Sequence, residues 1–501
     1  ASISGGSDKT TYYGSIGYKG QDGILQYGTD KYKRINMSFN FSTQITKWLE
    51  VTFRTKYNRN TSDYPYTSNF NLGNIFYEIY RGFPTIPVYL PNGNNFAGIA
   101  GSNFNYNFAG LLDGAGRDKT NSDDFWYTAA FNLTPLAGLS IKGDYTGNKF
   151  YQDQTQHGKI LYQTMPEEST LSPLSVGTPG GVTKANYGDT YQALNLWADY
   201  KKSFNDKHNL GVMVGYNQES KKTTKLSVST SNLFDNNFPV TDLASTYNMP
   251  SEEATIWAVQ GAFFRLNYAF DDRYLLEVNG RYDGSSRFPS DERWAFFPSA
   301  SVGWRISQEP WWNVKSEHIS NAKVRFSWGS LGNAAGLSNY QYIQTLGISK
   351  SDYILDGLRQ NYMSSPAALP GNLTWETATT YDIGVDLGFF DNRLTVSGDY
   401  YIRKTTDMIV NGPTVPDVFG ASSPKGNYAD MSTYGYELSL EWRDGFDLAG
   451  KRFNYSIKGT LADYYSVIDR FNNANKSLSE YANQSLDKNY YEGMRIGEIW
   501  G

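Results

Sequence analysis

The chain contains no cysteine and only three histidines, and these shortages exclude several kinds of active site. Without cysteine there are no disulfides, no thiolate metal ligands and no cysteine nucleophile. The histidines, His157, His208 and His318, lie far apart and have no carboxylate ligands at metal-binding spacing. Metal catalysis and a histidine-based triad are therefore disfavoured. The sequence predicts neither an enzyme nor a bound cofactor.

Long apolar runs and an excess of basic residues are also missing. No stretch approaches the roughly 18 consecutive apolar residues that a membrane-spanning helix needs, and the mean hydropathy is −0.54. A helical membrane protein is thereby excluded. The formal net charge is −5 and no basic stripe is visible, which argues against a nucleic acid partner because such binders concentrate lysine and arginine.

Apolar and polar residues instead alternate with a period of two, which is typical of β-strands. The clearest hairpin covers residues 256–282 around a tight Asp271-Asp272 turn, and similar hairpins cover residues 381–402 and 434–461. We count roughly sixteen candidate strands, many long enough for the roughly 9–11 residues with which a tilted strand crosses a bilayer. No composition break divides the chain, so one all-β domain is predicted. A transmembrane antiparallel β-barrel satisfies this pattern, since only alternate residues of its strands meet lipid.

The links between the predicted strands fall into two classes. Residues 204–208, 270–273 and 390–393 are tight turns rich in aspartate and asparagine, whereas residues 60–123, 151–189, 221–254 and 332–374 are long and lack sustained alternation. Outer-membrane barrels have short periplasmic turns and long extracellular loops, which is the distribution predicted here. Within the first long link, the spacing of Leu72, Ile75, Phe76 and Ile79 predicts a short helix. That helix would either cap the barrel or contact its cargo.

Several motifs resemble those of one protein family. They are Arg281-Tyr-Asp-Gly-Ser-Ser-Arg-Phe288, Trp294-Ala-Phe-Phe-Pro-Ser299, Gly303-Trp-Arg-Ile-Ser-Gln-Glu309, Lys323-Val-Arg-Phe-Ser-Trp-Gly-Ser-Leu-Gly-Asn333, Leu373-Thr-Trp-Glu376, Gly384-Val-Asp-Leu-Gly388, Asn392-Arg-Leu394 and Tyr491-Glu-Gly-Met-Arg-Ile-Gly497. The opening Ser4-Gly-Gly-Ser-Asp-Lys-Thr-Thr-Tyr12 looks like a first barrel strand. Together the motifs resemble the SusC/RagA-like TonB-linked (TonB-dependent) outer-membrane transporters of Bacteroidota, over nearly the whole chain.

This resemblance implies a 22-stranded barrel of which residues 1–501 form a part, with the plug domain and the C-terminal strands outside this chain. It also implies nutrient uptake of oligosaccharides or peptides, energised by TonB through the plug. The implied partners are a SusD-like surface lipoprotein acting as a lid, and the lipid and lipopolysaccharide of the outer membrane.

Two groups of site residues are expected. Polar residues on one strand face are expected to line the lumen: Arg265, Asn267, Glu277, Asp382, Asp386 and Glu437. Aromatic residues of the first long link are expected to contact cargo or the lid: Tyr64, Tyr66, Phe70, Tyr77 and Tyr106. Two other functions stay open at this point, a barrel that serves as a scaffold without transport and a secreted glycan-binding β-sandwich or propeller.

Overall fold

The protein is an all-β structure. The computed structural model describes residues 1–66, 87, 89–93, 112–114, 116–160, 162–163, 172–173, 180–363, 366, 368–371, 373–412, 418, 423–471 and 490–498. A 17-stranded sheet and two two-stranded sheets account for the strands in these ranges. The helices among the described residues are all too short or too polar to cross a membrane. The chain divides into two compact units, one made of residues 1–133, 143–194 and 219–256 and the other of residues 134–142, 195–218 and 257–501.

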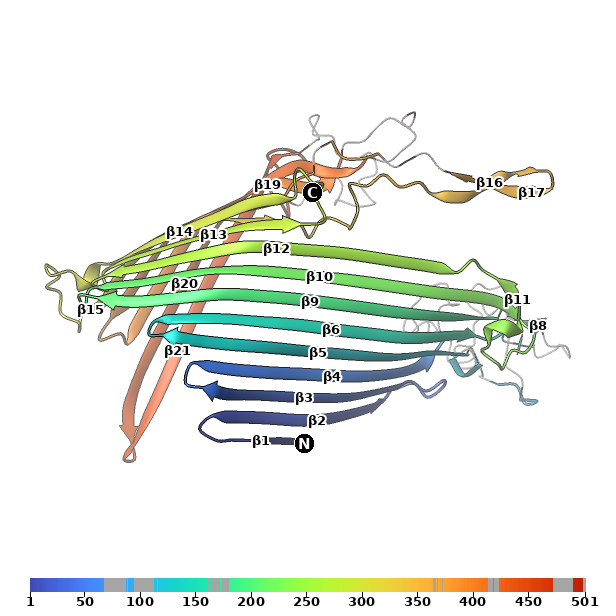
Figure 1. Cartoon of the computed structure of the whole chain (residues 1–501), viewed down its shortest axis with the longest axis horizontal. Helices are drawn as coiled ribbons and strands as arrows, with labels where there is room; N and C mark the ends of the chain where they lie inside the picture. The colour runs from blue at the N-terminus through green and yellow to red at the C-terminus, as the bar shows by residue number, and fades with distance from the viewer. Residues whose placement is uncertain are drawn as a thin grey trace. The chain divides into compact units, whose positions relative to one another are not determined.

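The strands of the first unit form an antiparallel meander (Figure 1). They are β1 (Ser2–Gly6), β2 (Thr10–Asp22), β3 (Lys31–Thr46) and β4 (Leu49–Pro65), followed by most of β5 (Gly116–Leu136) and β6 (Leu139–Gly158) and by parts of β9 (Gly181–Phe204), β10 (His208–Leu233) and β12 (Ser251–Phe270). The short strand β11 (Ala244–Tyr247) pairs with the end of β10. A two-stranded sheet, β7 (Tyr162–Gln163) and β8 (Ser172–Pro173), lies in the link between β6 and β9.

The second unit continues the same antiparallel pattern from β12 onward. Its strands are β13 (Tyr274–Ser285), β14 (Trp294–Arg305), β15 (Ile319–Asn333), β18 (Glu376–Phe389), β19 (Leu394–Asn411), β20 (Lys425–Leu448) and β21 (Lys451–Arg470), each paired with the next. The hairpin of β16 (Ile348–Leu355) and β17 (Leu358–Met363) lies in the link between β15 and β18. The predicted hairpins at residues 256–282, 381–402 and 434–461 are thus confirmed.

Every second link of an antiparallel meander lies at the same end of its strands, and here one end carries the tight turns. Asn205 and Asp206 after β9, and Asp271 and Asp272 after β12, have positive φ angles of 50–54°. Asparagine and aspartate enter this left-handed region more readily than other side chains, which explains their place in the tightest turns. The longest link at this end, residues 306–318, contains the 3₁₀ turn Ile306–Gln308.

Several predicted boundaries are wrong. The links expected at residues 60–123 and 151–189 are shorter, because β4 runs to Pro65, β5 begins at Gly116, β6 runs to Gly158 and β9 begins at Gly181. Residues 221–254 were expected to be a loop, but β10 continues to Leu233 and β12 begins at Ser251. The opening segment expected to be one strand is a hairpin in which residues 7–9 connect β1 to β2. In β10 the error has a physical cause. Residues 221–233 are mostly lysine, threonine and serine, so the strand has no apolar side to reveal its period of two.

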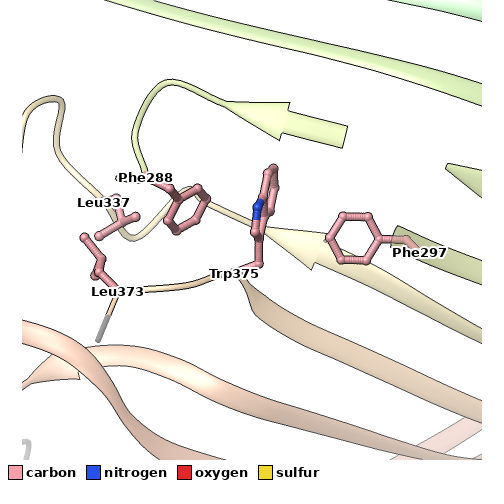
Figure 2. Close-up of a cluster of buried hydrophobic side chains, with 5 residues drawn as sticks. All are labelled: Phe288, Phe297, Leu337, Leu373 and Trp375. Carbon is pink, nitrogen blue, oxygen red and sulfur yellow. The ribbon is translucent and has the colours of Figure 1, made fainter. Parts of the chain in front are cut away.

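A small apolar core lies at the other end of the second unit, among the links (Figure 2). Trp375 stands between Phe288 and Phe297, with ring centroids 4.8 Å and 5.4 Å away. Leu337 and Leu373 complete the buried cluster. These residues come from three different links or strand ends, so the cluster ties the long link between β15 and β18 to the link between β13 and β14. Four of the family-like motifs, those that end at Phe288, Ser299, Asn333 and Glu376, lie in or beside it, which gives those motifs a packing role.

Candidate membrane wall and its polar face

One face of the second unit's strands is apolar and exposed, and we name it the apolar face. Its residues occupy alternate positions: Phe264, Leu266, Leu276, Val278, Val302, Phe326, Ile383, Val385, Leu438, Leu440, Ile457 and Leu461. Val302 and Ile383 are 49% and 52% exposed. Such a contiguous apolar surface is unfavourable in water, because large side chains of this kind are normally removed from it.

Aromatic residues bound this apolar face at both ends of the strands. On β13 the apolar positions run from Tyr274 to Tyr282, and on β20 from Trp442 to Tyr434. At roughly 3.3 Å per residue, each interval is about 26 Å along the strand. This matches the apolar band of outer-membrane barrels, which is roughly 25 Å tall between two aromatic girdles. The face therefore has the chemistry and the height of a lipid-facing surface.

The opposite face, which we name the polar face, carries an ion network across β15, β18 and β19. Arg325 Nη1 lies 2.5 Å from Asp399 Oδ1, and Arg325 Nε lies 3.1 Å from Asp386 Oδ2. Asp382 Oδ1 is 3.8 Å from Arg325 Nη1, and the Ser397 hydroxyl donates to Asp386 at 2.7 Å. Arg325 thus lies within 4.0 Å of three carboxylates, and Lys323 Nζ lies 4.0 Å from Asp386 Oδ2, on a surface where each of these side chains is only partly buried.

The structure brings the expected lumen residues into two groups. Asp382 and Asp386 meet at Arg325, and Glu437 is the cross-strand partner of Asp399 beside them. Arg265 Nε lies 3.9 Å from Glu277 Oε1, and Asn267 is the cross-strand partner of Glu277. Sequence reasoning did not identify Arg325 or Asp399. Each of them occupies a polar position in a strand where apolar and polar residues alternate. The same alternation identified the six residues that were expected to line the lumen.

A cavity of about 700 Å³ lies at the turn end of the second unit. Lys201, Asn209, Glu277, Lys323 and Arg325 are among the residues that line it. Its lining combines these cations, carboxylates and amides with apolar side chains such as Leu210 and Leu275, so the recess can accept polar groups. In the ranges that the structure describes, no three His, Asp or Glu side chains gather as ligands for a metal ion.

Of the five aromatic residues expected to contact cargo or the lid, the structure describes two. Tyr64 lies within β4 as the cross-strand partner of Asp118 and is 41% exposed, so the prediction that it belongs to a loop is wrong. Tyr66 follows β4, and its backbone N–H donates to the Gly116 carbonyl at 3.1 Å. Phe70, Tyr77 and Tyr106 lie outside the described residues, as does the predicted helix at residues 72–79.

Glu309 anchors the long link at the turn end and is nearly buried. Arg273 Nη1 donates to its Oε2 at 2.9 Å, and Trp304 Nε1 donates to its Oε1 at 2.9 Å. Hydrogen bonds from Tyr274 and Trp304, and then from Arg273, stabilise the charged form and hold the pKa of Glu309 below its usual range. The family-like motif that ends in Glu309 therefore closes a turn.

With this geometry in place, comparison with known proteins decides the family. Residues 74–493 match the family described as TonB dependent receptor-like, beta-barrel. The chain belongs to this family. This match, together with the relatives described next, confirms the SusC/RagA-like resemblance and the predicted barrel fold. The family is described as receptor-like, which agrees with the prediction that the chain is not an enzyme.

Relatives of this TonB-dependent receptor barrel support the same assignment. It is 28% identical to TonB-dependent receptor P3 of Formosa agariphila over 450 residues, covering 88% of this chain and 43% of the relative. It is 27% identical to TonB-dependent receptor SusC of Bacteroides thetaiotaomicron over 525 residues, covering 97% of this chain and 48% of the relative. The chain thus spans about half the length of these relatives.

The fold of the barrel is also similar to solved structures. The RagAB peptide importer in the "closed-closed" state aligns with a TM-score of 0.77 at 22% identity, covering 96% of this chain and 51% of that one. The outer membrane transporter YddB from Escherichia coli aligns with a TM-score of 0.55 at 9% identity, covering 93% of this chain and 54% of that one. At such identities the likeness concerns the fold.

Proposed function

We propose that the full-length protein is an outer-membrane transporter that imports large polar nutrients, either oligosaccharides or peptides. The observation that carries this proposal is the pair of faces in the second unit. An exposed apolar face bounded by aromatic residues suits lipid, and a polar face with compensated charges suits a hydrated lumen. Arg265, Asn267, Glu277, Asp382, Asp386 and Glu437 would then line the lumen.

Family membership supports a proposal for the energy source and for the surface partner. The family's name ties it to TonB, and SusC and the RagAB importer are, respectively, relatives of this chain by sequence and by fold. We therefore propose TonB as the energy-supplying partner and a SusD-like lipoprotein as a lid over the end that carries the long links. Tyr64 at the end of β4, together with Tyr66, Phe70, Tyr77 and Tyr106 of the link that follows in the sequence, is proposed to contact cargo or lid, because aromatic side chains supply contact area for both.

An uptake assay tests this proposal. Cells that express the full-length protein are compared with cells lacking the gene, or lacking TonB, for growth on a panel of oligosaccharides and peptides as sole carbon source. Transport predicts that growth on at least one compound is lost in both strains and returns with the restored gene. A protein that is present in the outer membrane yet affects no compound would be a scaffold, and the transport proposal would then be abandoned.

The division between the two ends can be tested in the same cells. Removing residues 94–110 should impair uptake or lid binding without reducing the amount of inserted protein, because the deletion ends before β5 begins. Replacing the Asp271-Asp272 turn by Asn-Gly is the matched control and should leave both unchanged. Loss of lid binding through the turn replacement instead would reverse the proposed orientation.

A further inference from the structure

Four cations on the polar face of the first unit have no carboxylate partner. Lys19 and Arg34 are direct cross-strand partners on β2 and β3, and Arg54 and Lys56 lie on the same face of β4. All four are exposed, and none forms an ion pair within the part of the chain that the structure describes. The apolar residues Ile16, Phe39 and Phe53 occupy the opposite face.

This arrangement differs from the polar face of the second unit. There Lys323, Arg325 and Arg265 each lie within 4.0 Å of a carboxylate. In the first unit the like charges of Lys19 and Arg34 stand directly opposite one another, which is destabilising by itself. A carboxylate of this face, Asp124 on β5, accepts from Trp126 Nε1 at 3.1 Å and from Asn148 Nδ2 at 2.5 Å, and among the described residues it forms no ion pair with the four cations. An anionic ligand would relieve the repulsion between Lys19 and Arg34 and would supply counter-charge to the four cations.

Amide and aromatic side chains fill the space between the cations. Asn36 and Asn58 are cross-strand partners one row from Lys56, and the Arg34 Nε–H donates to Asn36 Oδ1 at 3.1 Å. Trp126, 37% exposed, is the cross-strand partner of Lys56 on β5. The cross-strand row of Lys19 and Arg34 and the row of Tyr13, Asn40 and Arg54 are six residues apart along β2. At roughly 3.3 Å per residue, this is about 20 Å. The surface is long enough to contact several units of a linear polymer.

The composition of this face points to a saccharide and not to a peptide. The polar-face positions of β2, β3 and β4 hold no Leu, Ile, Val, Met or Phe. A peptide bound in extended form is recognised through pockets for alternate side chains, which this face does not offer. Amides, in contrast, both donate to and accept from hydroxyl groups. The exposed rings of Tyr13 and Trp126 present flat apolar surfaces to the C–H face of a sugar.

We propose that this face of β2–β5 binds an anionic oligosaccharide, one that carries carboxylate or sulfate groups. The inference rests on the proposed transport function and narrows its cargo class. Lys19, Arg34, Arg54 and Lys56 make charge-assisted hydrogen bonds to the anionic groups, and Asn36 and Asn58 bind hydroxyl groups between them.

Binding to the purified full-length protein in detergent tests the proposal. The probes are an oligogalacturonate for carboxylate, a dextran sulfate fragment for sulfate, a neutral maltooligosaccharide of equal length, and oligoglutamate. Isothermal titration calorimetry is run on the native protein, on the variant K19Q/R34Q/R54Q/K56Q and on the smaller variant R54Q/K56Q. The control K31Q/K33Q removes two exposed lysines from the opposite face of β3. Heat-modified electrophoretic mobility confirms that each barrel is folded.

One anionic saccharide should bind the native protein, and its affinity should fall roughly tenfold or more in the fourfold variant. The smaller variant should lose part of that affinity, and K31Q/K33Q none. Added salt should weaken the native binding by screening. Equal affinity for the neutral saccharide, binding of oligoglutamate alone, or unchanged affinity in both glutamine variants would each overturn the proposal. If cells with the fourfold variant still take up a neutral saccharide or a peptide through this protein, the inference about anionic cargo is refuted. The proposed transport function is then retained.

Discussion

Adjacent residues of one strand lie on opposite faces, so odd-numbered and even-numbered positions meet different environments. On β20, Leu438 belongs to the apolar face with its cross-strand partner Leu461, while Glu437 belongs to the polar face with Asp399. Parity is readable from sequence, and the six residues expected to line the lumen do share one side of their strands. That this side lines a lumen stays a prediction. The ion-pair partner of each charged side chain could not be predicted from the sequence. Arg325 meets Asp386 and Asp399 only because cross-strand register aligns segments far apart in the chain.

Leu438→Arg should destabilise the protein by about 2–4 kcal/mol, because the new charge would lie near the middle of the apolar face. Glu437→Gln removes a charge from the hydrated face and should have a mild effect. Urea unfolding in lipid vesicles, followed by tryptophan fluorescence, measures both. Equal destabilisation by the two changes would show that the assignment of the faces is wrong.

Acid should weaken the Glu309 anchor. Its folded-state pKa lies below the unfolded value of about 4.3, so the stabilisation is present above that value and disappears as pH falls through the folded pKa. Glu309→Gln should therefore lower the melting temperature at pH 7, and its difference from the native protein should shrink below pH 4. The measurement is differential scanning fluorimetry in detergent, with the exposed Glu317→Gln as control. A difference that grows with acidification would contradict the assigned sign.

Strands and tight turns were predicted well from sequence, whereas strand ends at the long links were not. Turns of the Asp271-Asp272 kind carry their own signal, since few residues accept positive φ. Where strands extend past the apolar band, both faces meet water and the period of two fades. The error at residues 221–254 arose there. The core around Trp375 was also missed, because its members are separated along the chain and only packing unites them.

Trp375→Ala should loosen the link between β15 and β18 without unfolding the sheet. Removing a buried aromatic ring costs about 3–5 kcal/mol of packing, and this loss falls on the contacts that hold the link. The prediction is that amide hydrogen exchange at residues 334–345 and 368–371 becomes faster while exchange in β13 and β14 is preserved. Tyr353→Ala, on the exposed strand β16, is the control and should change neither. Unchanged exchange in the link would mean that the cluster does not anchor it.

For the molecule as a whole, family membership was predictable from motifs because those motifs occupy places where packing or turns constrain the residue. Glu309 closes a turn, and Phe288 and Trp375 form a core. The cation group on β2–β4 had no such signal. Lys19, Arg34, Arg54 and Lys56 are scattered in sequence, and only the register of three strands places them on one face. Both the lumen and the cation group therefore depend on which face of the strands meets lipid and which meets water.

Site-directed labelling on β20 tests this central claim most directly. These 501 residues contain no cysteine, and any cysteine elsewhere in the full-length protein is first replaced by serine, so that each introduced thiol is unique. Single variants Glu437→Cys, Leu438→Cys, Ser439→Cys and Leu440→Cys of the full-length protein are reacted in outer-membrane vesicles. One reagent is a water-soluble maleimide and the other is a maleimide confined to the lipid phase. The account predicts that positions 437 and 439 react with the water-soluble reagent and positions 438 and 440 with the lipid-confined one. Reaction of all four positions with the water-soluble reagent at similar rates would contradict it.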